Sequence, residues 1–168
     1  MDQNQKYAFW RDEYLKLQDQ YEDFDRRSLT IKGWIAAGSV TAMAIGLDSS
    51  KSPYIWIVIA LVSACFWYLE ANWKMFQYAL QSRIRILEAA FRDDPDILWK
   101  DPPPFQIFSW WFRAYADREP IYADEKDRPK LSRAQWLRRI ALQRFVMLPY
   151  VLFILLSIVG FVWRLTHS

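Results

Sequence analysis

The sequence predicts an all-α integral membrane protein: three transmembrane helices and a cytoplasmic helical stalk. Three observations predict this class. Apolar residues make up 53% of the 168 residues and aromatics 18%, and ten tryptophans are more than a soluble domain of this size usually carries. The mean hydropathy of -0.13 averages long uncharged runs with heavily charged stretches. Three uncharged runs of fifteen to nineteen residues approach the length that crosses a bilayer.

The first two runs predict a transmembrane hairpin over residues 29–69. The first span, 29–47, contains fifteen uncharged residues from Gly33 to Leu47. Including residues 28–31 extends the run to twenty when Lys32 extends its ammonium toward the headgroups. The second span covers 53–69. Because only a tight turn fits between the two spans, they run antiparallel.

The second and third spans have recognisable starts. Ser52 is a suitable N-cap, and Pro53 fits the first helical position. The third span, 145–163, has nineteen uncharged residues, or about 28 Å of helix. Pro149 is predicted to bend its first turn.

Basic residues set the predicted orientation. Six Lys or Arg residues lie from Lys6 to Lys32, fourteen lie from Lys74 to Arg144, and only Lys51 and Arg164 lie on the other side. We therefore expect a multi-pass protein of the inner (plasma) membrane with a cytoplasmic N-terminus. The short tail, 165–168, is expected outside.

Residues 1–28 predict a cytoplasmic amphipathic helix. Aromatic and apolar residues recur at spacings of three and four, and charged residues such as Glu13 occupy the face expected to meet water. This heptad seam either docks on the chain's own stalk or associates between chains. The seam consists of Tyr7, Trp10, Tyr14, Leu17, Tyr21 and Phe24.

The stalk is predicted over residues 70–92, as a continuation of the second span. No helix breaker occurs from Pro53 to Arg92, and an apolar stripe along the stalk matches the heptad seam. Glu70 and Lys74 have the spacing of an i, i+4 ion pair at the membrane interface.

Residues 93–132 form a Pro-rich and aromatic cytoplasmic segment. Pro102, Pro103 and Pro104 favour a stiff extended chain that leads into a short helix with an aromatic residue on every side. Such a helix lies in the headgroup layer, packs under the stalk, or binds a partner. Its aromatic residues are Phe105, Phe108, Trp110, Trp111, Phe112 and Tyr115.

Residues 133–164 predict a basic helix that leads directly into the third span. Ser132 and Gln135 have the spacing of a capping box at its start. Arginines near the cytoplasmic ends of the spans serve orientation and attract anionic lipid headgroups, with a pocket for an anionic nucleotide or headgroup as the alternative. They are Arg26, Arg27, Arg133, Arg138, Arg139 and Arg144.

The first span carries a small-residue face. Gly38, Ala42 and Gly46 stand four apart, which allows another helix to approach closely. This face packs either within the hairpin or between protomers.

The sequence lacks the residues that several classes of function require. A single cysteine, Cys65, and a single histidine, His167, exclude a disulfide framework, a Cys/His zinc site and a recognisable nucleophile–histidine pair. No charged residue lies deep within a span, so charge-coupled transport has no visible groups. We therefore expect no catalytic, cofactor-binding or metal-binding residues, and no nucleic-acid partner, because the basic residues flank apolar runs.

The layout resembles a known family. An amphipathic helix, a short-turn hairpin and a second span that runs into WKMFQYALQSRIRILEAAF are similar to the SLATT-type small membrane effectors of bacterial conflict (anti-phage) systems, over about residues 7–92. The resemblance implies a protein that assembles and perturbs the membrane when an associated sensor signals infection. It carries no diagnostic motif, and the third span departs from the simple two-span form.

Our functional hypothesis is a non-enzymatic homo-oligomer that forms or gates a membrane lesion under the control of its cytoplasmic helices. The alternative is a membrane anchor or accessory subunit that recruits a soluble partner protein through the aromatic segment or the seam. A third hypothesis, an enzyme at the bilayer surface, would need a carboxylate pair such as Asp93 and Asp96, whose context is more simply a helix stop.

Overall fold

The computed structural model describes residues 2–48 and 50–167, and over these residues the chain is helical with no β-strand. Met1, Ser49 and Ser168, which belong to the predicted N-terminal helix, hairpin turn and tail, lie outside the described residues. The all-α prediction is confirmed. The elements are α1 (Gln3–Gly46), α2 (Tyr54–Phe91), α3 (Ile107–Phe112), the π-turn η1 (Arg113–Asp117), the 3₁₀ turn η2 (Ala123–Glu125), α4 (Arg133–Ala141) and α5 (Arg144–Thr166).

Helices α1, α2 and α5 are long and apolar enough to cross a membrane, as predicted. The second span and the stalk form one helix of 38 residues. It ends at Phe91, one residue before the predicted end, and Asp93 then adopts a left-handed conformation with φ of 49°. The amide of Asp94 donates to the carbonyl of Ala89, which closes the last turn.

The chain divides into two compact units, and α1, α2 and α4 contribute residues to both. The aromatic unit comprises residues 1–25 and 73–136, and the bundle unit comprises residues 26–72 and 137–168.

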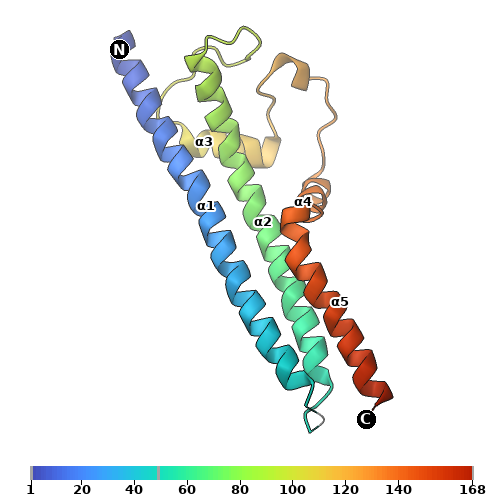
Figure 1. Ribbon diagram of the computed structural model, residues 1–168. Coiled ribbons are helices and arrows are strands. Elements are labelled where there is room, and N and C mark those ends of the chain that lie inside the picture. The colour runs from blue at the N-terminus through green and yellow to red at the C-terminus, as the bar shows by residue number, and fades with distance from the viewer. Residues whose placement is uncertain (1, 49, 168) are drawn as a thin grey trace. The chain divides into compact units, whose positions relative to one another are not determined.

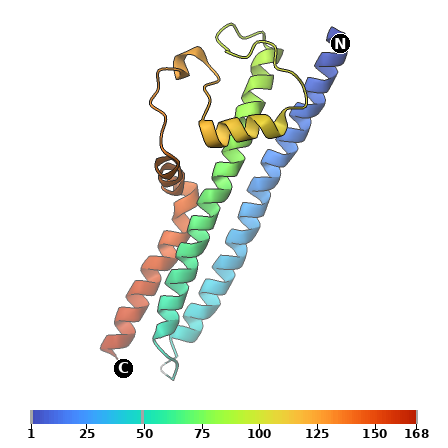
Figure 2. The ribbon, with the colours of Figure 1, turned by 180° about the vertical axis from the view of Figure 1, so that it is seen from behind.

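In the aromatic unit, the first part of α1 packs along the last part of α2, and α3 crosses α2 (Figures 1 and 2). The indole of Trp111 in α3 donates to the carbonyl of Phe76 in α2 at 3.2 Å, which fixes this crossing. A second small core forms where Ile97 and Ile121 pack beside α2, and a single β-bridge joins Ile97 to Tyr122.

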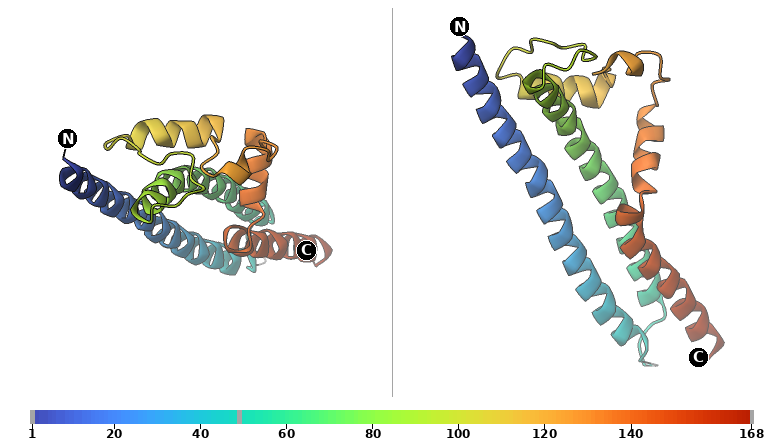
Figure 3. Two further views of the ribbon diagram at one scale, coloured as in Figure 1. Left: turned by 90° about the horizontal axis from the view of Figure 1, so that it is seen from above. Right: turned by 45° about the horizontal axis from the view of Figure 1, so that its top comes forward.

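In the bundle unit, the last part of α1, the first part of α2, and α5 lie side by side (Figure 3). Their core contains Ile35 of α1 with Tyr150 and Phe153 of α5. Near the hairpin turn, the buried ring of Trp56 fills the space left by two glycines: a Cβ would lie 2.9 Å from it at Gly46 and 2.5 Å at Gly160.

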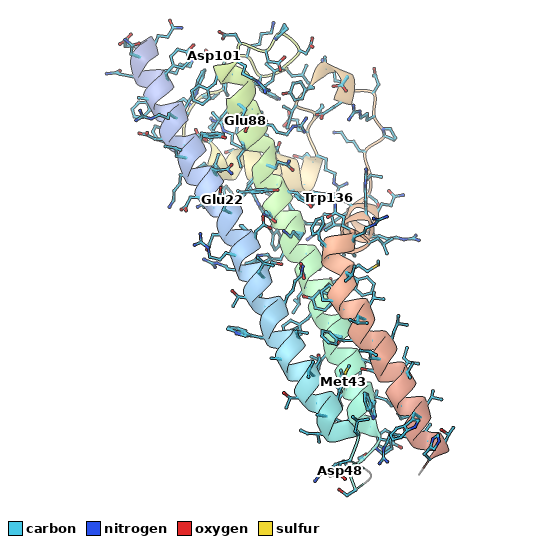
Figure 4. All side chains as sticks on the ribbon, viewed as in Figure 1. Glu22, Met43, Asp48, Glu88, Asp101 and Trp136 are labelled. Carbon is cyan, nitrogen blue, oxygen red and sulfur yellow. The ribbon has the colours of Figure 1, made fainter. Side chains whose placement is uncertain are left out.

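The hairpin turn and the start of α4 are capped by short-range bonds. Asp48 accepts a bond from the amide of Ser50 at 2.9 Å, which lowers the pKa of its carboxyl group (Figure 4). The predicted capping box before α4 is confirmed, because Ser132 and Gln135 exchange bonds of 2.7 and 3.2 Å.

The prediction that the basic helix leads directly into the third span is wrong. Helix α4 ends at Ala141, Gln143 is extended, and α5 begins at Arg144 (Figure 3). The indole of Trp67 donates to the carbonyl of Ala141 at 2.9 Å. In a continuous helix this carbonyl would instead accept a bond from a backbone amide four residues later.

Candidate functional site

The heptad seam of α1 is covered by α2 of the same chain. Trp10 and Leu17 are buried against Leu80, Ile84 and Leu87. The other seam residues lie around this core: Tyr14, Tyr21 and Phe24 are half-buried, and Tyr7 is 37% exposed beside Phe91. Intramolecular docking is one of the two predicted uses, and it occupies the centre of the seam.

Two seam tyrosines also meet polar groups. The hydroxyl of Tyr14 donates to Glu88 at 3.2 Å (Figure 4), and burial together with this carboxylate raises the pKa of Tyr14. Burial likewise raises the pKa of Tyr21. The backbone carbonyl of Tyr21 accepts a bond from Gln77 at 2.9 Å.

A buried ion pair joins α1 to α2 inside the aromatic unit. Arg83 donates to both carboxylate oxygens of Glu13, at 2.9 and 3.0 Å, and each side chain is 1% exposed. Arg83 also donates to the carbonyl of Pro103 at 2.8 Å, and the amide of Phe105 donates to Glu13 at 3.1 Å. Sequence reasoning wrongly placed Glu13 on the water-facing side, because it flanks the seam.

The aromatic segment divides between two environments. Trp110 is buried, and the rings of Trp111 and Tyr115 stack at 4.9 Å and pack on Phe76 of α2. These contacts correspond to the predicted packing under the stalk. Three other rings of the segment are exposed: Phe105, which precedes α3, at 69%, and Phe108 and Phe112 of α3 at 77% and 53%.

Phe105 is held in an unusual backbone conformation. Its φ is 61°, a left-handed value that costs a bulky side chain of order 1–3 kcal/mol. The bond from its amide to the buried Glu13 carboxylate maintains this conformation. The result is an exposed ring that packs against Phe9 at 5.0 Å between ring centres.

Glu70 is the centre of a polar cluster in the bundle unit. Its carboxylate accepts bonds from Ser28 at 2.9 Å and Tyr150 at 2.7 Å, and it pairs with Lys32 at 2.8 Å. The predicted partner, Lys74, is wrong: Lys74 pairs with Asp25 within the aromatic unit.

Pro149 explains the second contact of Lys32. Because proline has no amide hydrogen, the carbonyl of Phe145, four residues earlier, lacks its helical donor. The ammonium of Lys32 donates to that carbonyl at 2.6 Å. The proline thus creates an acceptor that ties α5 to α1. The sequence could have predicted the Lys32–Glu70 pair. Both residues lie about equally far from the hairpin turn, and an antiparallel hairpin brings such residues to the same height.

The small-residue face is used unevenly. At Gly46 a Cβ would meet Ile55 and Trp56 at 2.9 Å, so this glycine serves packing inside the unit. Ala42 is half-buried. Gly38 is exposed, and a Cβ there would meet nothing within 4 Å. The sequence also missed Gly160, whose lone position in an apolar run gave no periodic signal.

The predicted arginines are exposed, and they fall into both units. Arg133 belongs to the aromatic unit, where its guanidinium lies 4.7 Å from the ring centre of Tyr115. The others belong to the bundle unit: Arg26, Arg27, Arg138, Arg139 and Arg144.

Within residues 2–48 and 50–167, no group of three or more His, Cys, Asp or Glu side chains is placed to hold a metal ion. Asp93 and Asp96 lie in the turn that ends α2, where the amide of Asp96 donates to Asp94 at 3.1 Å.

The structure thus offers helix-packing surfaces, exposed aromatic rings and exposed arginines. No family model, curated protein or solved structure matches the chain.

Proposed function

We propose that this chain is a non-enzymatic membrane protein that self-associates through the open edge of α1 around Gly38, and that the assembly perturbs or perforates the membrane. The observation that carries the proposal is the empty space at Gly38. A glycine in an apolar helix that serves no contact within its own chain leaves room for the backbone of another helix.

The neighbours of Gly38 extend this edge along the helix. Trp34, Thr41 and Ile45 precede or follow it by three to seven residues, so with about 3.6 residues per turn they share its face. All three are exposed, Trp34 at 73% and Ile45 at 47%. Gly38 and Thr41 are small, and they lie between the larger side chains of Trp34 and Ile45. This arrangement leaves a hollow in which a second helix can pack.

In the described part of the bundle unit, the polar groups around Glu70 are bonded to one another and do not line an aqueous path. Glu70 and Lys32 are bonded to each other and to neighbouring groups. The groove of about 340 Å³ between α2 and α5 is lined by apolar residues and Ser157. A water-filled lumen would therefore require several protomers. The resemblance of the sequence layout to SLATT-type effectors favours such an assembly.

The test compares Gly38→Leu with Gly33→Leu. Both glycines have open space at the Cβ position, but Gly33 lies on the opposite side of the α1 edge. Mass measurement in nanodiscs and crosslinking in membranes should show a discrete oligomer for the wild type and Gly33→Leu and smaller species for Gly38→Leu. Liposome leakage should fall with assembly. A monomeric wild type, or equal assembly of all three proteins, would refute the proposal.

A second function is favoured by the exposed rings of Phe105 and Phe108. In this hypothesis the chain anchors a soluble partner, which binds these exposed rings. The strained backbone of Phe105 gives this surface a fixed shape. Phe105→Ser with Phe108→Ser should abolish recruitment of that partner without changing membrane insertion. Retention of the same partner by the double variant would contradict it. Removing the whole segment is a poorer test, because Trp110 is part of the core.

A further inference from the structure

The bundle unit carries a large excess of positive charge. It contains eight basic and two acidic residues, a net charge of +6, whereas the fourteen basic and seventeen acidic residues of the aromatic unit give -3. Both acids of the bundle unit have local roles. Glu70 is paired with Lys32, and Asp48 caps the hairpin turn. Basic residues of the unit therefore outnumber its acidic residues by six.

Four arginines of the bundle unit lie at its Glu70 end. Arg26 precedes Ser28, which bonds Glu70, and Arg144 precedes Phe145, whose carbonyl bonds Lys32. Trp67 bonds the carbonyl of Ala141, which places the last turn of α4 one helical turn from Glu70. That turn carries Arg138 and Arg139.

These four residues, Arg26, Arg138, Arg139 and Arg144, form the arginine cluster. All are exposed, and over the described part of the chain none of the four makes an ion pair. Guanidinium groups bind phosphate oxygens in pairs of hydrogen bonds, and they are desolvated more readily than ammonium groups.

An apolar strip begins immediately beside the cluster. Phe145, Leu148 and Leu152 follow Arg144 along α5, at helical spacing, and they are 53%, 62% and 50% exposed. A ligand with an anionic head and a hydrocarbon chain would place its head on the arginine cluster and its chain on the apolar strip. Free phosphate would use the arginines alone.

We propose that the arginine cluster and this strip bind anionic phospholipids, with the lipid phosphate on the guanidinium groups and an acyl chain along α5. The inference rests on the membrane insertion contained in the proposed function, and it adds a lipid preference. Because a basic side chain near a membrane surface favours anionic lipid by about fivefold, loss of three arginines should weaken this preference by about 100-fold.

The experiment counts lipids retained by the full chain, by native mass spectrometry, after reconstitution in nanodiscs of phosphatidylcholine with or without phosphatidylglycerol. The test variant carries Arg138→Gln, Arg139→Gln and Arg144→Gln. The matched control carries Lys100→Gln, Lys126→Gln and Lys130→Gln, which remove the same charge from exposed sites of the aromatic unit. Circular dichroism confirms that each variant is folded.

The wild type and the lysine control should retain phosphatidylglycerol over phosphatidylcholine, and the arginine variant should lose the preference. No preference in the inserted wild type, an equal loss in the lysine control, or displacement of the lipid by inorganic phosphate would each overturn the inference.

Mass and flotation separate this result from the proposed function. A membrane-inserted monomer with a phosphatidylglycerol preference refutes self-association alone. An inserted oligomer without the preference refutes the lipid site alone, and a wild type that does not float with vesicles refutes both.

Discussion

Replacement of Arg83 by methionine should destabilise the aromatic unit strongly. Methionine has a similar length and packs in apolar surroundings, but it removes both bonds to Glu13 and the bond to the Pro103 carbonyl. The Glu13 carboxylate would stay buried with only the amide of Phe105 as a partner. The variant therefore leaves an uncompensated charge in the interior.

Removal of one partner from a buried ion pair costs about 3–5 kcal/mol. Residues 1–25 and 73–136 make up 89 residues. For a unit of this size, each kcal/mol lowers the melting temperature by about 4–8 °C. The melting temperature of the aromatic unit in Arg83→Met should thus lie at least about 12 °C below that in the wild type.

Thermal unfolding of the full chain in detergent, followed by near-ultraviolet circular dichroism, measures this change. Hydrogen exchange across residues 80–91 assigns the transition to the aromatic unit. The double variant Glu13→Leu, Arg83→Met should be more stable than either single variant, because no buried charge remains. A single variant that melts within about 3 °C of the wild type, or a double variant less stable than both singles, would refute the reasoning.

Three further predictions concern other contacts. Gly160→Ala should lower the free energy of unfolding by about 1–3 kcal/mol, because its Cβ would lie 2.5 Å from Trp56. The control Gly33→Ala should not destabilise the protein, because its Cβ would meet nothing within 4 Å. Thermal melts of both variants check this, and Trp56→Leu should partly rescue Gly160→Ala. Tyr150→Phe should cost about 1.5–3 kcal/mol through loss of its bond to Glu70, and an equal loss in the exposed control Tyr54→Phe would contradict that origin. Burial alone would raise the pKa of Glu125, but bonds from the Ile121 amide and Arg85 lower it. Glu125 therefore stabilises the fold above its unfolded pKa of about 4.3, and this contribution is lost as the pH falls through the lower folded value. The difference in melting temperature between the wild type and Glu125→Gln should shrink from pH 7 to pH 3.5, and a constant difference would count against it.

Local patterns were sufficient for the three long helices and for the start of α4. Uncharged runs predicted α1, α2 and α5 as candidate spans, and the capping box before α4 placed its start correctly. The seam of α1 pointed to the core around Trp10 and Leu17. These predictions succeed because helix periodicity, capping and apolar length depend on residues only a few positions apart.

The tertiary structure decided how the polar residues are partnered. The burial of Glu13 depends on Arg83 and on the return of the Pro-rich segment, whose backbone supplies further bonds to this pair. The break after α4 depends on Trp67, from a distant part of the chain. No local pattern encodes which side chain arrives at a given carbonyl or carboxylate.

The sequence by itself thus determined the three long helices, their order and the apolar seam that α1 buries. Only the tertiary structure decided that Gly46 serves the chain's own packing, that Gly38 stays open, and that Glu70 pairs with Lys32. The physical reason is that burial of an apolar stripe tolerates many neighbours. A buried charge or an absent Cβ is matched only by the particular group that the register of two helices brings against it.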